Sequence, residues 1–268
     1  MIDHAALENT EFAAFIDLYR AAPDEVRVAH AVGVHELAGT TGLTSRGVEP
    51  AAVFRRAVGL GLIHAATEIE LEDVLAYMKA RTTSYVVPVA PHSQPAALST
   101  WLERRGFRRG YAWMKFRRAC TGAPRASSDL EVRVVGRELG SAFGRVVAEG
   151  FGLPQSVVPW IGALPGRPNW VCVMAFSGAD AVAAGAVYLS GTHAWLGLGT
   201  TLPSHRRLGA QAALLARRLD QAAARGAKVA VTETGERLPD KPSGSYRNIL
   251  RAGFEEMYLR QNFMSPST

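Results

Sequence analysis

Cysteine is scarce in this sequence, which contains only Cys120 and Cys172 among 268 residues. The two lie far apart and show none of the short spacings that metal ligands adopt. We therefore expect reduced thiols in a cytoplasmic protein, and no bound metal.

Long apolar runs are absent as well. No stretch of 18 apolar residues occurs, and the apolar segment 181–189 is too short to cross a bilayer. The first residues, MIDHAALENTEF, lack the basic region followed by an apolar run that marks a signal peptide. The sequence thus predicts neither membrane insertion nor export.

The composition that remains is that of a globular protein. Hydrophobic residues make up 48% of the chain and charged residues 20%, which suffices for a sizeable core. The length fits one large domain or two ordinary ones. The net charge of +6 suits a polyanionic ligand such as a nucleotide cofactor, and it suits nucleic acid equally well.

Apolar periodicity in the first 120 residues indicates a mixture of helices and strands. The predicted helices are residues 11–20, 68–81 and 95–105. The predicted strands lie around Val32 and Val34 and at 53–62, 85–89 and 108–118, with a Gly/Thr/Ser loop at 39–46.

The segment 104–118, RRGFRRGYAWMKFRR, is dense in arginine with aromatic residues between the charges. This interleaving is typical of surfaces that bind single-stranded nucleic acid. It is also the pattern of a strand with aromatic residues on its core face and solvated arginines on the other. No known nucleic-acid-binding motif accompanies the segment, so we favour the strand and expect no nucleic acid partner.

Residues 119–128, ACTGAPRASS, are small and rich in Pro, Gly and Ser, which predicts a linker. Beyond it the patterns predict the order β-α-α-β-β-β-α-β-α-β. The predicted strands are residues 129–135, 170–176, 182–189, 195–201, 228–234 and 255–264. The predicted helices are residues 138–149, 157–164, a long one that begins near Gly209, and 245–252.

The stretch 195–224 joins a strand, a short turn and the long helix. Pro203 ends the strand because proline cannot donate to a ladder. Apolar residues recur at helical spacing along the helix, and Arg217 and Arg218 lie largely off that apolar face.

The loop before this helix predicts an anion site. The first helical turn leaves backbone N–H groups without partners at the positive end of the helix dipole. Gly209 lets a phosphate approach the main chain, and Arg206 and Arg207 add positive charge. Neither a Walker A sequence nor a dinucleotide fingerprint occurs here. The alternative is a solvated arginine pair before an amphipathic helix.

Residues 206–211 resemble the [QR]-x-x-G-x-[GA] signature of the GNAT superfamily of N-acetyltransferases. Arg206 and Gly209 match its first and fourth positions, whereas Gln211 stands where glycine or alanine is usual. The element order of residues 129–268 matches the family's layout too. The resemblance implies bound acetyl-CoA, with its pyrophosphate on Arg206, Arg207, Leu208, Gly209, Ala210 and Gln211 and its pantetheine arm along Gly199, Thr200 and Thr201.

Two similar segments within the chain suggest an internal repeat. The pairs Gly106-Phe107 and Gly253-Phe254 each follow a predicted helix and precede a predicted strand. We infer two tandem GNAT-like domains, residues 1–120 and 129–268, joined by a linker at 121–128. Each is expected to be α/β (α+β), a mixed, mostly antiparallel sheet flanked by helices. The first lacks the phosphate loop, so we expect it to be degenerate and to bind no cofactor. Chance similarity is the alternative to a repeat.

Acetyl transfer to an amine needs a donor for the developing oxyanion and a base for the amine. The resemblance places the donor, a backbone N–H, at Gly199, beside a slot between strands 195–201 and 228–234. Glu233 on the second of these strands is the first candidate base. Glu149, at the end of a helix, is the second. A solvated surface carboxylate is the alternative for each.

The leaving thiolate also needs a proton. Many members of the family supply it from a tyrosine at the position where this chain has Ile249. Tyr246 and Tyr258 are the remaining candidates, with ordinary packing as the alternative. Asn248 is expected either to contact the pantetheine or to cap the short helix.

The acceptor pocket is expected within residues 149–170, including Phe151, Trp160 and Trp170, with or without the first domain; the same residues equally suit a core. The prediction is a cytoplasmic acetyl-CoA-dependent N-acetyltransferase that acts on a primary amine of a small molecule or peptide by direct transfer in a ternary complex, as a monomer or homodimer. The alternative is a non-catalytic GNAT-fold binding module, either a CoA sensor or a basic protein that binds a partner or nucleic acid.

Overall fold

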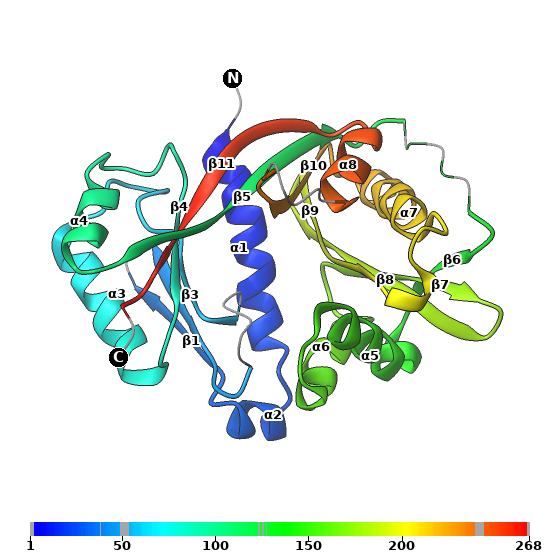
Figure 1. Ribbon diagram of the computed structural model, residues 1–268, viewed down its shortest axis with the longest axis horizontal. Helices are drawn as coiled ribbons and strands as arrows, with labels where there is room; N and C mark the ends of the chain where they lie inside the picture. Colours follow the sequence, from blue (N-terminus) through cyan, green and yellow to red (C-terminus); the bar gives the residue numbers. More distant parts are fainter. Residues whose placement is uncertain are drawn as a thin grey trace.

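One continuous sheet runs through the chain (Figure 1). The computed structural model describes residues 3–37, 39–48, 54–122, 124, 126, 128–238 and 244–266. Within those residues, eleven strands pair in the order β1-β2-β3-β4-β11-β5-β10-β9-β8-β7-β6. In this described part only the β3–β4 and β9–β10 pairs are parallel. The predicted mixed, mostly antiparallel sheet is confirmed.

The elements have the following bounds. The strands are β1 Gly33–Leu37, β2 Thr40–Thr44, β3 Arg56–Val58, β4 Val86–Val89, β5 Arg108–Ala119, β6 Glu131–Val135, β7 Trp170–Ser177, β8 Asp180–Ser190, β9 His193–Thr201, β10 Val229–Gly235 and β11 Glu255–Met264. The α-helices are α1 His4–Arg20, α2 Asp24–Ala29, α3 Glu68–Arg81, α4 Leu98–Arg104, α5 Gly140–Phe151, α6 Val158–Gly162, α7 Ala210–Ala224 and α8 Gly244–Arg251. The 3₁₀ turns are η2 Arg137–Leu139, η3 Gln155–Val157 and η4 Pro203–His205.

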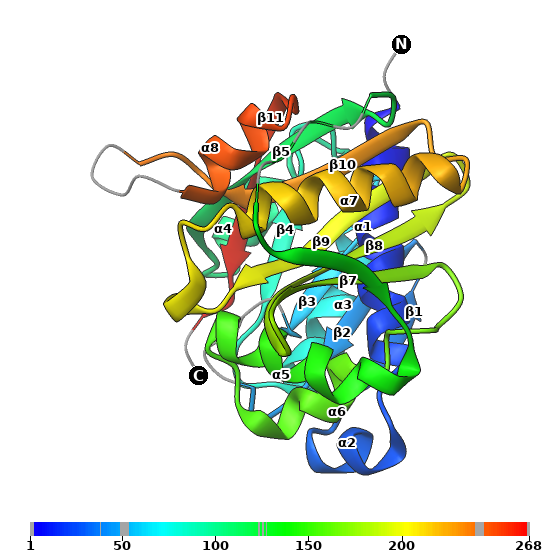
Figure 2. The ribbon, with the colours of Figure 1, turned by 90° about the vertical axis from the view of Figure 1, so that its right-hand side faces the viewer.

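Helices cover both faces of the sheet (Figure 2). In the second half of the chain, α7 and α8 pack on one face, and α5 and α6 pack on the other together with α1 from the first half. Strand alternation makes this possible, since neighbouring residues point to opposite faces. On β9, Trp195 packs with α1 and Leu196 packs with α7.

Two neighbouring segments show where periodicity predicts structure and where it fails. Helix α3 spans the predicted 68–81, because its buried residues recur at helical spacing and a capping box at Thr67 fixes its first turn. The predicted loop at 39–46 is wrong, because Thr40–Thr44 form a fully buried strand. The sequence TTGLT looks like a loop, but Gly42 leaves room for the Tyr77 ring of α3, 2.7 Å from where a Cβ would lie.

The two halves of the chain exchange their last strands. Strand β5, from the first half, pairs with β10 of the second half, and β11, from the second half, pairs with β4 of the first. The exchanged strands also pair with each other, and Figure 1 shows them arching together across the molecule. The predicted domains 1–120 and 129–268 therefore build one sheet together, and that division stays a prediction.

Helix α1 forms the second connection between the halves. The Asp17 carboxylate accepts two hydrogen bonds from Arg167, at 2.7 and 2.8 Å, and one from Trp170 Nε1 at 2.7 Å. Trp160 Nε1 donates to the carbonyl of Leu18 at 2.8 Å. These contacts hold α1 against the sheet of the second half, beside the slot that the sequence analysis predicted.

Candidate active site

The slot lies where two parallel strands part. Strands β9 and β10 pair only from His193 to Trp195, opposite Val229 to Val231, and then diverge. Thr232 Oγ1 spans the beginning of the gap with a hydrogen bond to the carbonyl of Leu196, 2.8 Å long. Beyond this point the edge of β9 that faces β10 is open to a ligand, since it has no strand partner there.

A β-bulge interrupts β9 beside the slot. Thr200 lies opposite Ala184 and Gly197 lies opposite Ala186, so two residues of β9 face one residue of β8. The bulged residues are Leu198 and Gly199, and Leu198 has a φ of +53°. Such a bulge releases backbone groups from the ladder, which is what an oxyanion donor at this position requires.

The loop after β9 is shaped as an anion cradle. Gly209 is the N-cap of α7 with a φ of +77°, and Arg207 has a φ of +68°. Helix α7 has 15 residues, and its first backbone N–H groups face a cleft of about 850 Å³. We call it the phosphate cleft; Thr200, Thr201, Arg206, Arg207, Ala210 and Gln211 are among its lining residues.

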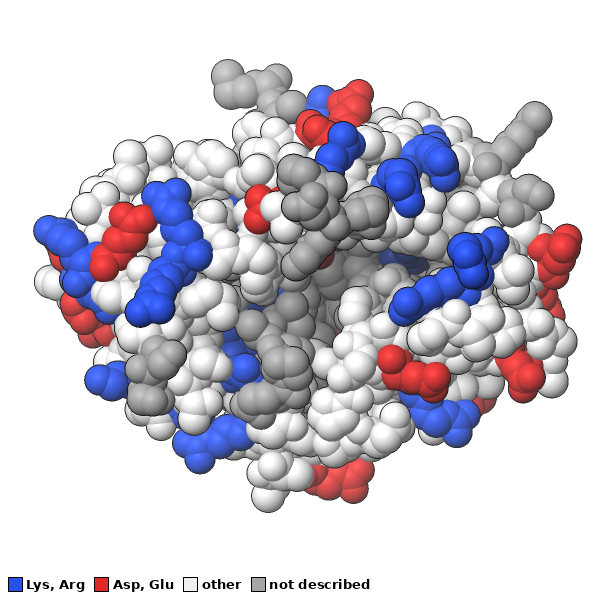
Figure 3. Space-filling view, viewed as in Figure 1, with Lys and Arg blue, Asp and Glu red and all other residues white. Residues whose placement is uncertain are grey.

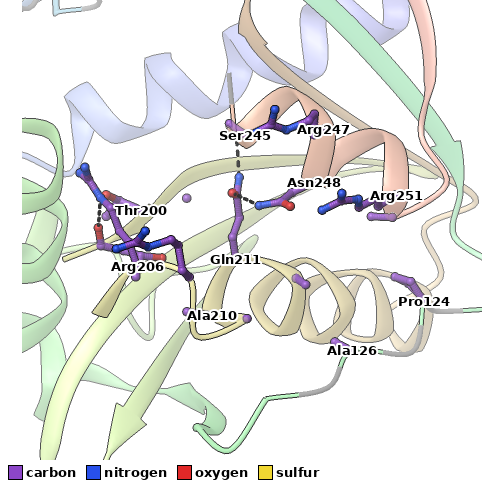
Figure 4. A pocket seen from close by; sticks show the side chains of 17 residues that line it. Pro124, Ala126, Thr200, Arg206, Ala210, Gln211, Ser245, Arg247, Asn248 and Arg251 are labelled. Carbon is purple, nitrogen blue, oxygen red and sulfur yellow. Dashed lines mark hydrogen bonds between the residues drawn. The ribbon is translucent and has the colours of Figure 1, made fainter. Parts of the chain in front are cut away.

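Four arginines and no carboxylate are found among the described residues that line this cleft. Arg206 and Arg207 come from the loop, and Arg247 and Arg251 come from α8 on the facing wall (Figure 4). The second pair was not among the residues predicted from the sequence. Their spacing of four residues, which places both on one side of the helix 245–252, was the available signal. The cleft is therefore strongly electropositive, as a di- or triphosphate-bearing ligand requires.

Gln211, the departure from the family signature, links the two helices that border the cleft. Its Nε2 donates to Ser245 Oγ at 2.9 Å, and its Oε1 accepts from Asn248 Nδ2 at 2.7 Å (Figure 4). The side chain thus extends from the first turn of α7 toward α8. Asn248 also lines the cleft, so its predicted contact with the pantetheine stays a prediction. The predicted helix cap is wrong, because Asn248 lies inside α8 and its side chain bonds Gln211.

A second cavity, of about 380 Å³, adjoins the phosphate cleft. We call it the inner chamber. It shares Gly199, Gln211 and Ser245 with the cleft. Its walls come from both halves of the chain, and Figure 3 shows the protein surface hollowed between those halves. The apolar walls include Phe15, Phe54, Trp113, Phe151, Leu153 and Trp195.

Glu233 is the one carboxylate among the described residues that line the inner chamber. It accepts hydrogen bonds from Trp195 Nε1, at 3.0 and 3.1 Å, and from Lys115 Nζ at 3.0 Å. Its side chain is only 9% exposed. The predicted base is therefore a buried carboxylate held in one orientation, and not a solvated one.

Behind Glu233 lies a buried charge cluster in which three acids meet three bases. Its members are Glu8, Glu11, Arg56, Lys115, Glu233 and Arg260. Glu11 accepts hydrogen bonds from Arg260 at 2.6 and 2.8 Å, from Arg56 at 3.0 Å, and from Lys115. Glu8 and Glu11 lie on α1, so the first half of the chain contributes to the electrostatic environment of Glu233.

Burial raises the pKa of Glu233, and the nearby Glu11 raises it further against the opposing effect of Lys115. Burial also raises the pKa of Glu11, but Arg260 and Lys115 outweigh it and hold that pKa well below its ordinary value. Within this pair, then, Glu11 keeps the charge and Glu233 is the group more ready to take a proton. A pKa shifted upward is what a carboxylate base for an amine needs.

The remaining predicted residues lie away from the cavities. Glu149 is exposed on α5 and lines neither cavity. The Tyr246 hydroxyl donates to Glu256 at 2.6 Å, and Tyr258 donates to Glu8 at 2.8 Å. Burial, and then the bond to Glu256, raise the pKa of Tyr246 to about 12. Their catalytic roles stay predictions that this geometry does not favour.

Of the other predicted residues, some line a cavity and some do not. Phe151 lines the inner chamber, whereas Trp160 and Trp170 are buried in the core and hold α1 in place. Leu208 is half exposed, and its carbonyl accepts from Ser128 Oγ at 2.9 Å.

Arg218 corrects a prediction from the helix pattern. It was expected off the apolar face of α7, yet it is 3% exposed and points to the sheet. Its Nη1 donates to the carbonyl of Gly197 at 3.1 Å, and its side chain lines the inner chamber. Glycines at 185 and 199 make the room, since an added Cβ at either would lie 3.0–3.1 Å from the guanidinium.

The described residues contain neither a membrane-spanning helix nor a metal-binding cluster of side chains. No helix there is both long and apolar enough to cross a membrane. No group of three or more His, Cys, Asp or Glu side chains there is arranged to hold a metal ion.

Comparison with known proteins bears on the fold. No protein-family model matches the sequence, and no curated protein matches it. Among solved structures, a GCN5-related N-acetyltransferase from Kribbella flavida aligns with a TM-score of 0.62 and 18% identity, over 91% of this chain and 93% of its own. A GCN5-related N-acetyltransferase from Sphaerobacter thermophilus aligns at 0.58 and 16%, over 77% and 68%.

A tandem GNAT protein from the clavulanic acid biosynthesis pathway aligns with a TM-score of 0.56 and 14% identity, over 85% of this chain and 79% of its own. The resemblance predicted from residues 206–211 is thus confirmed at the level of the fold: this chain has the fold of the GCN5-related N-acetyltransferases, the GNAT superfamily.

Proposed function

We propose that this protein is an acetyl-CoA-dependent N-acetyltransferase, located in the cytoplasm, that transfers an acetyl group directly to a primary amine in a ternary complex. The observation that carries the proposal is the meeting of the two cavities at Gly199. The phosphate cleft suits the diphosphate end of acetyl-CoA, and the inner chamber suits the acceptor. A thioester that enters along β9 would reach the acceptor at that meeting point.

The reaction follows from the groups around Gly199. The acceptor ammonium gives one proton to Glu233, and the neutral amine attacks the thioester carbonyl carbon. A backbone N–H at the bulge stabilises the negative charge on the carbonyl oxygen. The carbon–sulfur bond then breaks, and the second proton of the amine nitrogen passes to the sulfur of CoA. The products are the acetylated amine and free CoA, and the proton on Glu233 returns to solvent.

The alternative, a non-catalytic GNAT-fold binding module, is not favoured. A pure binding module has no need of a buried carboxylate in an apolar chamber beside the ligand cleft, because such a group costs stability.

The first experiment measures acetyl-CoA binding. At a concentration one hundred times the dissociation constant, the ligand should stabilise the fold by about 2.7 kcal/mol and raise the melting temperature. Arg247→Glu should abolish that rise because it places a carboxylate in the phosphate cleft. Arg145→Glu is the matched control, since Arg145 is exposed on α5, on the other face of the sheet. Absence of any stabilisation in the unaltered protein would refute the proposal.

A further inference from the structure

The inner chamber has a chemistry that selects its ligand. Aromatic side chains from both halves form its walls: Phe15, Phe54 and Trp113 from the first, and Phe151 and Trp195 from the second. The volume of about 380 Å³ lies at the small end of the range for ligand pockets, about 300–1,000 Å³. The cavity therefore fits a small molecule with a mostly apolar body.

The charged groups of the chamber narrow the class further. Glu233 is the one carboxylate among the described lining residues, and Arg218 is the one cation. A single amine can give its proton to Glu233, whereas a second ammonium in the same molecule would find no second carboxylate among the described lining residues and would be repelled by Arg218. A sugar would bury hydroxyl groups against those walls without hydrogen-bond partners, which costs free energy.

We propose that the acceptor is a small monoamine with an aromatic or branched apolar body, whose amino group lies at Glu233 and whose body lies among the aromatic residues from both halves. This inference rests on the proposed function. It also gives the first half of the chain a role, because its residues Phe15, Phe54 and Trp113 would contact the acceptor body.

The test compares amines by the release of free CoA thiol from acetyl-CoA. We expect 2-phenylethylamine and isoamylamine to be acetylated with kcat/KM at least 100-fold above glucosamine and spermidine. Phenylalanine is included because its carboxylate would pair with Arg218 beside Gly199, where the thioester must lie; we expect it to be a poor acceptor. Preference for glucosamine, spermidine or phenylalanine would overturn the proposed class.

A variant locates the acceptor body. Phe151 lines the chamber but is 52% exposed, so Phe151→Asp is compatible with folding. It should raise KM for 2-phenylethylamine about tenfold and leave stabilisation by acetyl-CoA unchanged. Ile69→Asp on α3, where Ile69 is 75% exposed, is the control and should change neither. An unchanged KM in Phe151→Asp would overturn this placement.

The two proposals fail in different ways. If acetyl-CoA gives no stabilisation, the proposed function fails. If acetyl-CoA stabilises the protein but neither apolar amine is acetylated, the acceptor class fails and the proposed function still stands on cofactor binding.

The surroundings of Arg218 support a second inference, which does not depend on the class of the acceptor. Its guanidinium is buried, and no acidic side chain pairs with it among the described residues. Burial lowers its pKa to about 10, which reflects the cost of a buried charge without a counter-ion. Nε donates to the carbonyl of Leu214 and Nη1 to that of Gly197, so Nη2 is the part of the fork left for a ligand.

The location of Nη2 identifies the anion it would meet. It lies 3.1 Å from where a Cβ of Gly199 would be, at the bulge between the two cavities. We infer that Arg218 is a catalytic residue that stabilises the negative charge on the thioester oxygen during the attack. The charge is absent from the resting enzyme and arises only in the transition state, where a fixed, water-excluded donor has its largest effect.

Stability and activity should therefore change in opposite directions on substitution. Arg218→Met removes an uncompensated charge, so the melting temperature should stay equal or rise, with acetyl-CoA affinity within threefold. kcat should fall about 100- to 1,000-fold, the usual loss for one oxyanion donor. Arg218→Lys, which keeps the charge, should retain an intermediate kcat. A lower melting temperature with unchanged kcat in either variant would show a structural role only and overturn the inference.

Discussion

At the scale of single residues, the chemistry of the site depends on the burial of Glu233 and on the charged groups around it. Glu233 lies in an apolar chamber, yet two donors, Trp195 and Lys115, fix its orientation. Glu11 stands behind it and remains ionised because three cations surround it. The combination leaves Glu233 as a carboxylate that accepts a proton more readily than one in water.

Glu233→Gln tests this assignment. The amide has the same shape and still accepts a hydrogen bond from Trp195, but it cannot take a proton. We expect kcat/KM to fall about 100- to 10,000-fold at neutral pH, the usual effect of losing a general base. Thermal melting checks that the fold survives.

The dependence of activity on pH tests the same assignment. A base must be ionised to act, so the activity of the unaltered enzyme should rise as the pH passes upward through the raised pKa of Glu233. This rise should disappear in Glu233→Gln, and Glu149→Gln should retain it as the control. An unchanged profile in Glu233→Gln would assign the base elsewhere.

The sequence indicated Glu233 as a candidate base, but its partners could not be predicted from it. Glu8 and Glu11 lie on a helix that begins the chain, where charged side chains ordinarily face solvent. Both are fully buried, because strands from three distant segments surround α1 and bring Arg56, Lys115 and Arg260 to it. Pairings over such distances along the chain leave no local periodicity to read.

At the scale of elements, helices α7 and α8 border the phosphate cleft on opposite sides. Gln211 on α7 bonds both Ser245 and Asn248 on α8. This link fixes the distance between the cradle at Gly209 and the arginines of α8. A small residue at 211, as the family signature has, would lack it.

A double-mutant cycle on Gln211 and Asn248 tests the link. If Asn248 acts on acetyl-CoA through Gln211, Gln211→Ala and Asn248→Ala should each weaken binding by about 0.5–1.5 kcal/mol. The double variant should then be no weaker than the weaker single one, with a coupling of at least about 0.5 kcal/mol. Calorimetric titration measures all four affinities. Fully additive effects would instead assign Asn248 a contact of its own with the cofactor.

Helix α1 provides the second test at this scale. Burial raises the pKa of Asp17, but hydrogen bonds from Arg167 and Trp170 outweigh it and hold the pKa below its ordinary value. A depressed pKa stabilises the fold above the ordinary value of about 3.9, and this stabilisation is lost as the pH falls through the folded-state pKa.

Asp17→Asn should therefore lower the free energy of unfolding by about 1–2 kcal/mol at pH 7, because the pair is partly exposed and solvent screens it. The difference from the unaltered protein should begin to shrink below about pH 4, where the unfolded chain takes up the proton, and should vanish only at a pH below the lower folded-state pKa, where the folded carboxylate is protonated as well. Urea unfolding at both pH values measures it. Asp220→Asn, at an exposed position of α7, is the control and should cost less than about 0.5 kcal/mol. A difference that persists at low pH would show that the charge of Asp17 is not the cause.

The backbone structure of the loop between β9 and α7 could be predicted from the sequence because its signals are local. Pro203 ends β9, Gly209 caps α7 with a positive φ, and the apolar spacing of α7 follows at once. Arg247 and Arg251 belong to the same cleft but to another segment, so no local pattern joined them to it.

At the scale of the whole molecule, the two matching Gly-Phe turns could be predicted from the sequence, but the way in which the two halves assemble could not. Gly106 and Gly253 both have a φ of +80°, and each ends the turn between a helix and a long strand, as the echo of the two Gly-Phe pairs predicted. The patterns place β5 and β11 each in its own half. Only the structure shows that each pairs with the penultimate strand of the other half.

This exchange predicts one cooperative unfolding transition for the whole chain. Removing either half would leave β4 or β10 without its neighbour and would also break the buried charge cluster, whose members come from both halves. Breaking such a cluster costs about 3–5 kcal/mol because unpaired charges stay buried. The halves therefore cannot melt one after the other, as two independent domains would.

Differential scanning calorimetry checks the point. The calorimetric and van't Hoff enthalpies should agree for the full chain, as they do for a single two-state unit. Residues 1–128 and 129–268, produced separately, should each lack a cooperative transition, and mixing or co-expression should restore one. The substitution Asp129→Asn, at an exposed position just after the predicted linker 121–128 and away from the exchanged strands, serves as the control that keeps a single transition. Two resolved transitions in the full chain would contradict this prediction. They would show that each half forms its own core and is stable without the exchanged strands.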